Sequence, residues 1–351
     1  YMAALFAEIG GRAKDYSDRT VTSIFIGGGT PSLLSGEQIG QLMDRIREQF
    51  AMAQDAEITM EVNPGTASAE KLRNFYTAGI NRLSIGMQSA QAEELKNLGR
   101  IHDFEGFCQV YREAVEAGFT NINVDIMSGL PGQTLASYRD TLEKVLHLEP
   151  MPQHISAYSL IVEEGTPFAA MAERGELPLP EEETERAMYE ETIEVLAKYG
   201  FHRYEISNYA RDGYECRHNV GYWIRRDYLG FGIGAASLID NVRFQNEKSL
   251  GAYLAHPLES REEEQTLTVQ DRMEETMFLG LRLTRGVSCV DFAEQYGRTV
   301  EEVYGEVIAR NVADGLLTVT ERKENQKKDR FLALTKRGLD LSNYVMAQFL
   351  F

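Results

Sequence analysis

The feature that most constrains this chain is a regular alternation of short apolar runs with longer amphipathic stretches between residues 21 and 160. The apolar runs predict buried strands, and the amphipathic stretches predict helices. The predicted strands are Val21–Ile26, Glu57–Val62, Asn81–Gly86, Asn121–Met127 and His154–Leu160, and the predicted helices between them are Gly36–Phe50, Ser68–Ala78, Asp103–Ala117 and Leu135–Leu148. Repeated strand–helix units build a parallel sheet, and an uninterrupted run of them favours a barrel over a doubly wound sheet.

The first predicted strand runs directly into Gly27-Gly28-Gly29-Thr30-Pro31-Ser32. Glycine permits positive φ and lets a ligand approach the backbone closely. Ligands of α/β proteins bind at the carboxyl ends of the strands, where this loop is expected. An ordinary strand-to-helix turn is the alternative, although three successive glycines exceed what such a turn needs. The stretch is not a Walker loop, because no Lys-Ser/Thr pair follows it, and its spacing differs from the dinucleotide-binding fingerprint.

Polar side chains collect where the predicted strands end, and together they predict a binding site at that edge of the sheet. They are Thr30, Glu61, Asn63, Gln88, Ser89, Asp125 and Tyr158. Glu61 and Asp125 are acidic residues in otherwise apolar strands, and a buried carboxylate is costly unless it is paired or hydrogen-bonded. The structural alternative is that each carboxylate pairs with a nearby arginine, such as Arg82 or Arg100.

The second half of the chain is less regular. A polar connection, Glu163–Glu181, precedes a predicted helix, Glu182–Tyr199, and a short predicted strand, Arg203–Ser207. The only tryptophan follows at Trp223, and Tyr228–Ser237 is a second glycine-dense stretch. The acidic, polar segment Glu259–Gln265 indicates a domain junction. We expect two domains, residues 1–240 and residues 241–351.

The last part of the chain predicts a winged-helix-like α+β module, because three helices precede a hairpin and a further helix. The predicted elements are the helices Val269–Leu283, Cys289–Tyr296 and Val300–Asp314, the strands Leu316–Thr320 and Arg330–Leu334 joined by the charged turn Glu321–Lys328, and the helix Thr335–Phe349. Such modules often bind DNA. Here the basic residues form one cluster, which is more simply a solvated turn: Arg322, Lys323, Lys327, Lys328 and Arg330.

Composition narrows the classes of partner. The chain carries 36 basic and 54 acidic residues, a net charge of −18, which argues against binding to nucleic acid or to an anionic lipid surface. No apolar run approaches the roughly 20 residues that span a bilayer. The three cysteines are far apart, form no CxxC pair and predict neither a metal knuckle nor a disulfide framework. Free thiols without a secretory signal indicate a cytoplasmic protein.

The motifs resemble those of a known superfamily. Gly27–Ser32 is similar to the loop of radical S-adenosylmethionine (SAM) enzymes that holds the methionine end of SAM. Glu61-Val62-Asn63-Pro64, Arg82–Ser89 and Asp125–Gln133 resemble later segments of the branch that contains the oxygen-independent coproporphyrinogen III oxidases. Arg217-His218-Asn219-x-x-Tyr222-Trp223 is similar to the HNxxYW signature of the HemW group of heme chaperones, which the oxidases lack. The resemblance covers nearly the whole chain.

This resemblance implies a partial (β/α)6 barrel followed by the C-terminal module. It also implies a SAM site, in which an acid for the ammonium, an arginine for the carboxylate and an aspartate for the ribose diol meet the chemistry of the ligand. By position, the SAM residues are Gly28, Gly29, Thr30, Glu61, Gln88, Arg100 and Asp125.

The HNxxYW signature implies a heme site. We expect His218, Asn219, Tyr222 and Trp223 to contact heme, with His218 as a possible iron ligand, because histidine beside aromatic residues suits a porphyrin. The alternative is that His218 is a structural residue that fixes a loop. Four arginines could receive the heme propionates or could be surface charges: Arg203, Arg217, Arg225 and Arg226.

Two features depart from the family pattern. The CxxxCxxC motif that binds a [4Fe–4S] cluster is absent, and Cys108, Cys216 and Cys289 cannot replace three closely spaced thiolates. Because the amphipathic segment Met2–Arg12 opens the chain in the middle of a fold, we expect the motif and the first barrel strand upstream of Tyr1. Relatives often carry histidine after Ala235, where this chain has Ala236.

The resemblance leaves three functions open. A heme chaperone would bind SAM, a [4Fe–4S] cluster and heme, and would carry heme to acceptor hemoproteins. An oxygen-independent coproporphyrinogen III oxidase would instead decarboxylate propionate side chains by radical chemistry. The HNxxYW residues favour the chaperone, whereas a fourth cysteine just after the CxxxCxxC would favour the oxidase. A radical enzyme acting on another tetrapyrrole is the third possibility. The sequence does not set the acceptor, the oligomeric state or whether SAM is cleaved.

Overall fold

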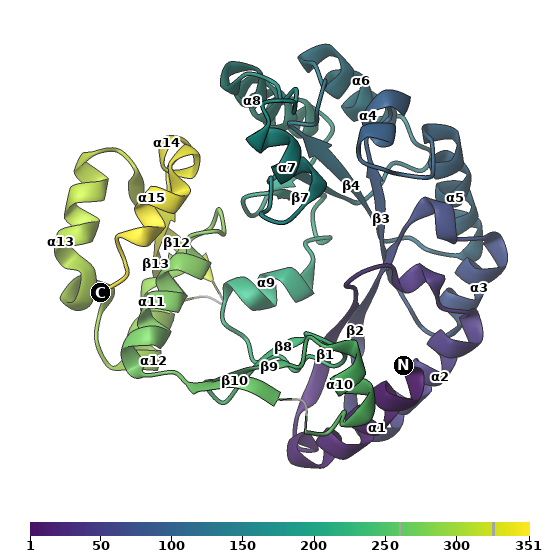
Figure 1. Ribbon diagram of the computed structural model, residues 1–351. Coiled ribbons are helices and arrows are strands. Elements are labelled where there is room, and N and C mark those ends of the chain that lie inside the picture. The colour runs from purple at the N-terminus through teal and green to yellow at the C-terminus, as the bar shows by residue number, and fades with distance from the viewer. Residues whose placement is uncertain (260, 325–326) are drawn as a thin grey trace.

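A computed structural model describes residues 1–259, 261–324 and 327–351. Its main element is a curled seven-stranded sheet with the order β1-β2-β3-β4-β5-β7-β6 (Figure 1). The strands are β1 (Thr20–Ile26), β2 (Ala51–Val62), β3 (Arg82–Gln88), β4 (Ile122–Ser128), β5 (His154–Ser159), β6 (His202–Arg203) and β7 (Asn208–Ala210). Strands β1 to β5 are parallel, and β7 and β6 close the sheet in antiparallel pairing. The partial barrel that the sequence predicts is confirmed.

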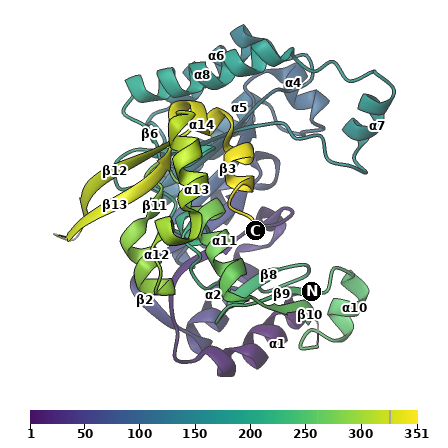
Figure 2. The same cartoon turned by 90° about the vertical axis from the view of Figure 1, so that its left-hand side faces the viewer.

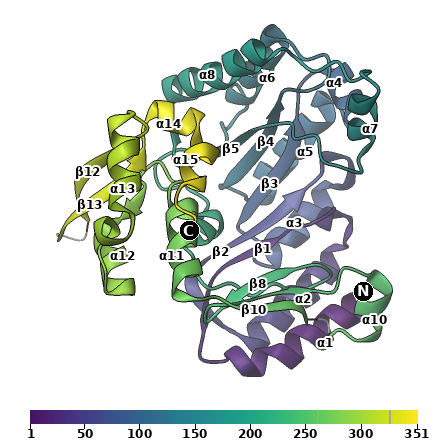
Figure 3. The same cartoon turned by 60° about the vertical axis from the view of Figure 1, so that its left-hand side comes forward.

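The helices that connect the parallel strands cover the outer, convex face of this sheet (Figures 1 and 3). They are α2 (Gly36–Gln49), α3 (Ala69–Thr77), α4 (Ala92–Asn97), α5 (Phe104–Ala117), α6 (Leu135–Leu146) and α8 (Glu182–Lys198). Local sequence fixes where several of them begin. Ser35 and Thr134 close capping boxes at the starts of α2 and α6, and Asp103 accepts from the Gly106 N–H at the start of α5.

The two faces of the sheet differ in chemistry because side chains alternate along each strand. Outward-facing residues such as Met60, Ile85 and Val124 are fully buried against the helices in the main core. The residues between them are polar along the whole inner face, including its amino-terminal half: Ser23, Glu57, Thr59, Glu61, Arg82, Ser84, Asn123, Asp125, His154, Ser156 and Tyr158. The apolar strand bodies that the sequence analysis expected are therefore apolar on one side only.

Several local predictions need correction. β2 begins at Ala51 rather than Glu57, because β1 pairs with it as far back as Thr20 across a register shift. The predicted strand Arg203–Ser207 is wrong, since the chain there turns between β6 and β7 and pairs antiparallel on both sides of the turn. The polar connection Glu163–Glu181 contains a short helix, α7 (Pro167–Glu173), which Thr166 caps.

A second, three-stranded sheet lies beside α1 (Met2–Arg12) at one end of the barrel (Figure 3). It consists of β8 (Ala236–Ile239), β9 (Val242–Asn246) and β10 (Arg261–Thr266), with α10 (Leu250–Ala255) between β9 and β10. The fully buried Glu8 carboxylate of α1 accepts hydrogen bonds from Asn246 and Tyr253, which fastens α1 to this sheet.

This sheet also bears on the predicted domain division. Most of the acidic segment predicted as a junction forms the exposed strand β10; Glu259 precedes the strand, and residue 260 lies outside the described residues. The boundary predicted between residues 240 and 241 falls in the turn from β8 to β9. The division into residues 1–240 and 241–351 stays a prediction.

The last part of the chain forms a winged-helix-like module with its own core (Figure 2). It contains α11 (Val269–Gly280), β11 (Val287–Ser288), α12 (Cys289–Tyr296), α13 (Val300–Ala313), β12 (Leu317–Glu324) and β13 (Lys327–Leu334). The centre of the predicted charged turn, residues 325–326, lies outside the described residues. The predicted helix Thr335–Phe349 is two helices, α14 (Lys336–Asp340) and α15 (Ser342–Ala347), because the chain leaves helical geometry at Leu341.

Short 3₁₀ helices complete the fold at Ala13–Tyr16, Pro31–Leu33 and Pro64–Thr66. The last two follow the carboxyl ends of β1 and β2, where proline at the first helical position suits a tight turn. Among the described residues, none of the helices has the length and apolar character needed to cross a membrane.

Candidate functional site

The glycine loop forms at the carboxyl end of β1. Gly28 and Gly29 have φ of +80° and +81°, a conformation that an L side chain rarely adopts. Open space surrounds the position of a Cβ at both residues. The Gly28 N–H donates to the Glu61 carboxylate over 3.1 Å, which joins this loop to the end of β2. The loop therefore presents exposed backbone beside a carboxylate, as a cradle for a ligand requires.

Glu61 and Asp125 line one cavity of about 270 Å³ on the inner face of the sheet. Burial raises the pKa of both carboxyls, although hydrogen bonds from Gly28 and Asn123 oppose the shift. In the described part of the chain neither carboxylate forms an ion pair with Arg82 or Arg100. The ion pairs that the sequence analysis gave as the structural alternative are therefore not formed. Two desolvated carboxylates that form no ion pair with a described residue suit a cationic ligand.

The remaining residues of the predicted SAM set lie at the same edge of the sheet. Gln88 ends β3 with φ of 69° and accepts a hydrogen bond of 2.9 Å from the Tyr158 hydroxyl, which lines the cavity. Thr30 follows the glycine loop directly. Arg100 follows α4 and is half-buried. It is not one of the residues that line the cavity.

The HNxxYW residues form a short helix, α9 (Arg217–Trp223), which the sequence analysis did not assign to an element. In Figure 1 this helix lies between the curled sheet and the C-terminal module. The Glu57 carboxylate of β2 accepts from the N–H groups of Arg217 and His218 over 3.1 and 3.0 Å. An anion at a helix N-terminus is stabilising, and this contact seats α9 against the inner face.

His218 is held on both sides of its ring. Nδ1 lies 3.0 Å from the Ser23 hydroxyl, Nε2 lies 3.1 Å from the Tyr222 hydroxyl, and the ring stacks on Phe25 with centroids 5.2 Å apart. Burial lowers the pKa of His218 to about 4, so its ring is neutral at physiological pH. Iron coordination by Nε2 requires the hydrogen bond to Tyr222 to open.

The other signature residues divide between two places. Asn219 lines the cavity that Glu61 and Asp125 share. Trp223 instead packs under the Arg282 guanidinium of the C-terminal module, 4.3 Å from the ring centroid. The structure thus brings Asn219 to the predicted SAM residues and directs Trp223 away from them.

Three of the four arginines predicted for heme propionates already have partners. Arg217 pairs with Asp55 over 2.8 Å, and Arg225 forms a buried ion pair with Glu275 over 2.7 Å. Arg203 donates to the carbonyl groups of Glu205 and Ile206. Arg226 is exposed, and its side chain makes no hydrogen bond or ion pair with the residues that the structure describes.

The three cysteines lie on separate elements. Cys108 is on α5, Cys216 precedes α9 and Cys289 begins α12. Burial raises the pKa of Cys216 to about 11, which leaves it a thiol. In the ranges that the structure describes, no group of three or more His, Cys, Asp or Glu side chains is arranged to hold a metal ion. Ala236, at the position where the sequence analysis noted a departure from the family pattern, is exposed at the start of β8.

Comparison with known proteins places this chain in a family. Residues 4–145 match the Radical SAM superfamily, and residues 267–341 match the HemN C-terminal domain. The protein named "Heme chaperone HemW" of Bacillus subtilis (strain 168) is 38% identical over 100% of this chain and 91% of its own length. Its namesake in Lactococcus lactis is 35% identical over 100% of this chain and 89% of its own length. The chain belongs to the HemW family.

A solved structure supports the same relationship at the level of the fold. The coproporphyrinogen III oxidase HemN from Escherichia coli, titled a radical SAM enzyme, superimposes with a TM-score of 0.83 and 26% sequence identity. The match covers 99% of this chain and 82% of that chain. This chain therefore shares both its barrel and its C-terminal module with that oxidase.

The site residues of this HemW family member differ in how well they fit the superfamily's two cofactors. The glycine cradle and the unpaired carboxylates of Glu61 and Asp125 fit SAM, which carries an ammonium and a sulfonium. The three cysteines do not fit a [4Fe–4S] cluster, because they lie on separate elements of the fold.

Proposed function

We propose that this chain is a heme chaperone that binds SAM at the inner-face cavity and heme beside α9, and that delivers heme to acceptor hemoproteins in the cytoplasm. The observation that carries the proposal is the placement of α9. Its signature residue Asn219 lines the same cavity as Glu61 and Asp125, so a heme beside α9 would adjoin the SAM site. Similarity over the whole chain to proteins named heme chaperones supports the same function.

In this proposal the inner-face residues bind and orient SAM. Glu61 and Asp125 offer carboxylates to its cationic groups and its ribose diol, and the N–H groups of Gly28 and Gly29 meet its carboxylate end with Thr30 and Arg100. Gln88, held by Tyr158, completes the pocket wall. In this superfamily, SAM bound beside a [4Fe–4S] cluster supplies radical chemistry.

The heme site in this proposal is the part of α9 that carries the HNxxYW residues. His218, Asn219, Tyr222 and Trp223 follow one another along two turns of this helix. His218 is the candidate iron ligand, and Arg226 is the arginine of the predicted set that stays available for a propionate. A heme carrier needs reversible ligation, and a histidine whose resting partner is the neutral Tyr222 hydroxyl can exchange that hydrogen bond for iron.

Heme titration tests the chaperone function. The full-length protein, reconstituted with its cluster, is titrated with heme and followed by visible absorption beside His218→Ala and His256→Ala. His256→Ala is the control, because it removes an exposed histidine directly after α10, beside the three-stranded sheet. We expect a saturable Soret shift at equimolar heme that is weakened only in His218→Ala. Absence of saturable binding by the intact protein refutes the chaperone function, and equal binding by all three proteins removes His218 from the heme site.

A second candidate function is oxygen-independent coproporphyrinogen III oxidase, which the close overlap with HemN favours. The reconstituted protein is incubated anaerobically with SAM, reductant and coproporphyrinogen III, and the porphyrin products are separated by chromatography. Decarboxylated product formed over many turnovers would establish this activity. Incubation with heme in place of the porphyrinogen tests a radical modification of heme itself, because a carrier returns heme unchanged.

A further inference from the structure

The cavity contains a buried cation without a counter-ion. Arg82 is the first residue of β3 and is 2% exposed, yet it lines the cavity with Asp125 and Ser84. Its Nε has no hydrogen-bond partner, and its only contact through Nη1 is a long one of 3.5 Å to the Thr59 hydroxyl. Among the described residues it forms no ion pair within 4.0 Å. A buried charge without a partner lowers folding stability, so its presence here indicates that it binds an anionic ligand.

The carboxylates near Arg82 are engaged by other donors. Asp125 accepts from the Asn123 amide over 2.7 Å and from the Ser84 hydroxyl over 3.3 Å. Glu61 accepts from the Gly28 N–H at the opposite end of the cavity. Arg82 is thus attracted to Asp125 at longer range and forms no ion pair with either carboxylate.

Two further donors of the cavity lining are also unused. Within the part of the chain that the structure describes, the Ser207 hydroxyl and the Asn219 side-chain amide have no hydrogen-bond partner, and both line the cavity with Arg82. Ser207 lies in the turn between β6 and β7, and Asn219 lies on α9. Three elements far apart in sequence therefore present free donors to one space, which calls for an acceptor with more than one oxygen.

The position of this space restricts the acceptor. Arg82 pairs with Thr59, which pairs with Phe25, so Arg82 lies one residue before the level at which β1 ends and the glycine loop follows. The methionine end of SAM is expected to use the N–H groups of Gly28 and Gly29 with Thr30 and Arg100, so the Arg82 donors stay available for a second carboxylate beside it. The macrocycle is expected beside α9, whose Asn219 lines this cavity, so a side arm of the ring can reach the Arg82 donors.

We propose that Arg82, Ser207 and Asn219 form a carboxylate-binding subsite that takes one propionate arm of the tetrapyrrole. This inference rests on the proposed function, since a heme carrier supplies the propionate. It replaces the arginines that the sequence analysis chose, three of which the fold uses elsewhere. It also gives Asn219 of the HNxxYW signature a role that does not involve iron.

Heme dimethyl ester tests the subsite, because it keeps the macrocycle and blocks both carboxylates. The full-length, reconstituted protein is titrated with heme, with the dimethyl ester and with SAM. The same titrations are made on Arg82→Gln, Arg82→Lys and the control Arg112→Gln, which removes an exposed arginine from the outer helix α5. Circular dichroism and thermal melting verify that each variant is folded.

We expect Arg82→Gln to weaken heme binding at least about tenfold, the effect of losing one charge-assisted hydrogen bond. The heme affinity of Arg82→Lys should lie between those of the wild-type protein and Arg82→Gln, because an ammonium keeps the positive charge but lacks the planar guanidinium. The wild-type protein should bind the dimethyl ester as weakly as Arg82→Gln binds heme. Arg82→Gln should bind heme and the ester with equal affinity, because the interaction is already lost. The SAM affinity of Arg82→Gln should equal that of the wild-type protein, and Arg112→Gln should bind heme, the ester and SAM as the wild-type protein does.

Other results overturn the subsite in distinguishable ways. Equal affinity of the wild-type protein for heme and its ester refutes propionate recognition while the chaperone function stands. Loss of SAM binding alone in Arg82→Gln assigns the carboxylate to SAM and refutes the assignment to the tetrapyrrole. Failure of the wild-type protein to bind heme refutes the proposed function itself. If Arg82→Gln does not fold, Ser207→Ala replaces it, and its unchanged heme affinity refutes the subsite.

Discussion

At the scale of single residues, burial on the inner face of the sheet shifts the pKa values of ionisable groups toward their uncharged forms. Burial raises the pKa of Glu61 and Asp125 and lowers the pKa of His154 and His218. All four shifts share a cause, since burial disfavours whichever form is charged. The ligand-free inner face therefore contains an electrostatic cost that a ligand of complementary charge relieves.

Glu61 is the residue with the clearest expected effect on SAM. Glu61→Gln should weaken SAM binding about tenfold, the usual loss for one hydrogen bond to a charged group. A proton competes with the cationic ligand for this carboxylate, so SAM affinity should rise as pH increases through the raised pKa of Glu61. Isothermal titration calorimetry between acid and neutral pH measures both effects. The exposed Glu70→Gln on α3 is the control, and an unchanged affinity in Glu61→Gln contradicts the assignment.

His218 predicts how stability depends on pH. Its pKa is lowered in the folded protein from 6.5 to about 4, so between these values the unfolded chain binds more protons and stability falls as pH falls. Between pH 7 and pH 5 the wild-type protein should lose up to about 2 kcal/mol more than His218→Gln, which does not titrate. Urea unfolding at the two pH values measures the difference. Equal losses in both proteins would show that His218 titrates normally.

At the scale of elements, the glycine loop can be tested against a matched control. Gly28 and Gly200 have φ of +80° and +83°, and neither has an atom within 4 Å of an added Cβ. Alanine at either position should cost about 1–2 kcal/mol of folding stability from the left-handed backbone alone. Only Gly28→Ala should also reduce SAM affinity, because Gly28 contacts Glu61 through its N–H and its methyl group would occupy open space at the proposed SAM site. Equal SAM affinity in the two variants would exclude the loop from the SAM site.

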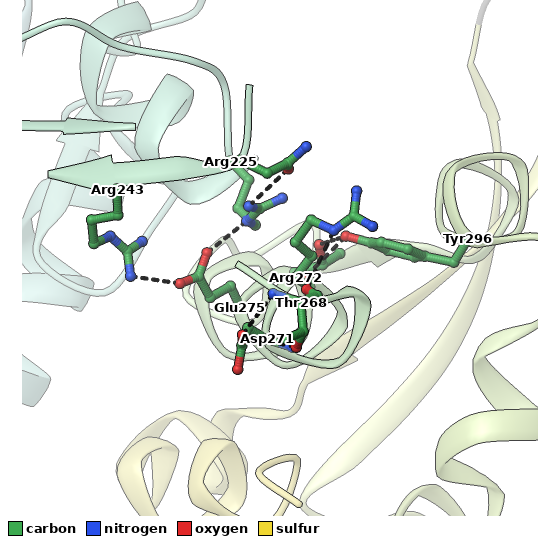
Figure 4. Close-up of polar contacts among 9 residues, drawn as sticks. Arg225, Arg243, Thr268, Asp271, Arg272, Glu275 and Tyr296 are labelled. Atoms are coloured by element: carbon green, nitrogen blue, oxygen red, sulfur yellow. Dashed lines mark hydrogen bonds and ion pairs between the residues drawn. The ribbon is translucent and has the colours of Figure 1, made fainter. Parts of the chain in front are cut away.

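At the scale of the whole molecule, one carboxylate joins three parts of the fold. Glu275 of α11 pairs with Arg225, which follows α9, and with Arg243 of β9, each over 2.7 Å (Figure 4). The Arg225 and Glu275 side chains are 4% and 7% exposed. Together with the contact between Arg282 and Trp223, this cluster fixes α9 between the barrel and the C-terminal module.

Removal of Glu275 should loosen this junction. Glu275→Ala leaves Arg225 buried without its partner and should cost about 3–5 kcal/mol, whereas the double variant Glu275→Met, Arg225→Met should recover most of that loss. Urea unfolding measures the stability, and fluorescence of Trp223, the only tryptophan, reports the junction directly. The exposed Glu264→Gln on β10 is the control. A neutral effect of Glu275→Ala would show that the cluster does not hold the module in place.

The sequence by itself determined the parallel architecture, because hydrophobic periodicity and caps are local properties of the chain. Ser35 and Asp103 cap the predicted helices, and the family motifs placed Gly28, Glu61 and Asp125 at one edge of the sheet. The same local signals missed α9, which has too few residues for a helical period and depends on the Glu57 carboxylate for its first turn.

Only the tertiary structure decided which polar side chains meet. The sequence does not show which arginines form ion pairs. In the structure Arg225 pairs with Glu275, whereas Arg82 lies in the cavity without an ion-pair partner among the described residues. The meeting of Arg82, Ser207 and Asn219 depends on how far the sheet curls and on where α9 is seated. These are long-range packing outcomes, set by burial of the outer face and by desolvation of the inner one, and no local pattern encodes them.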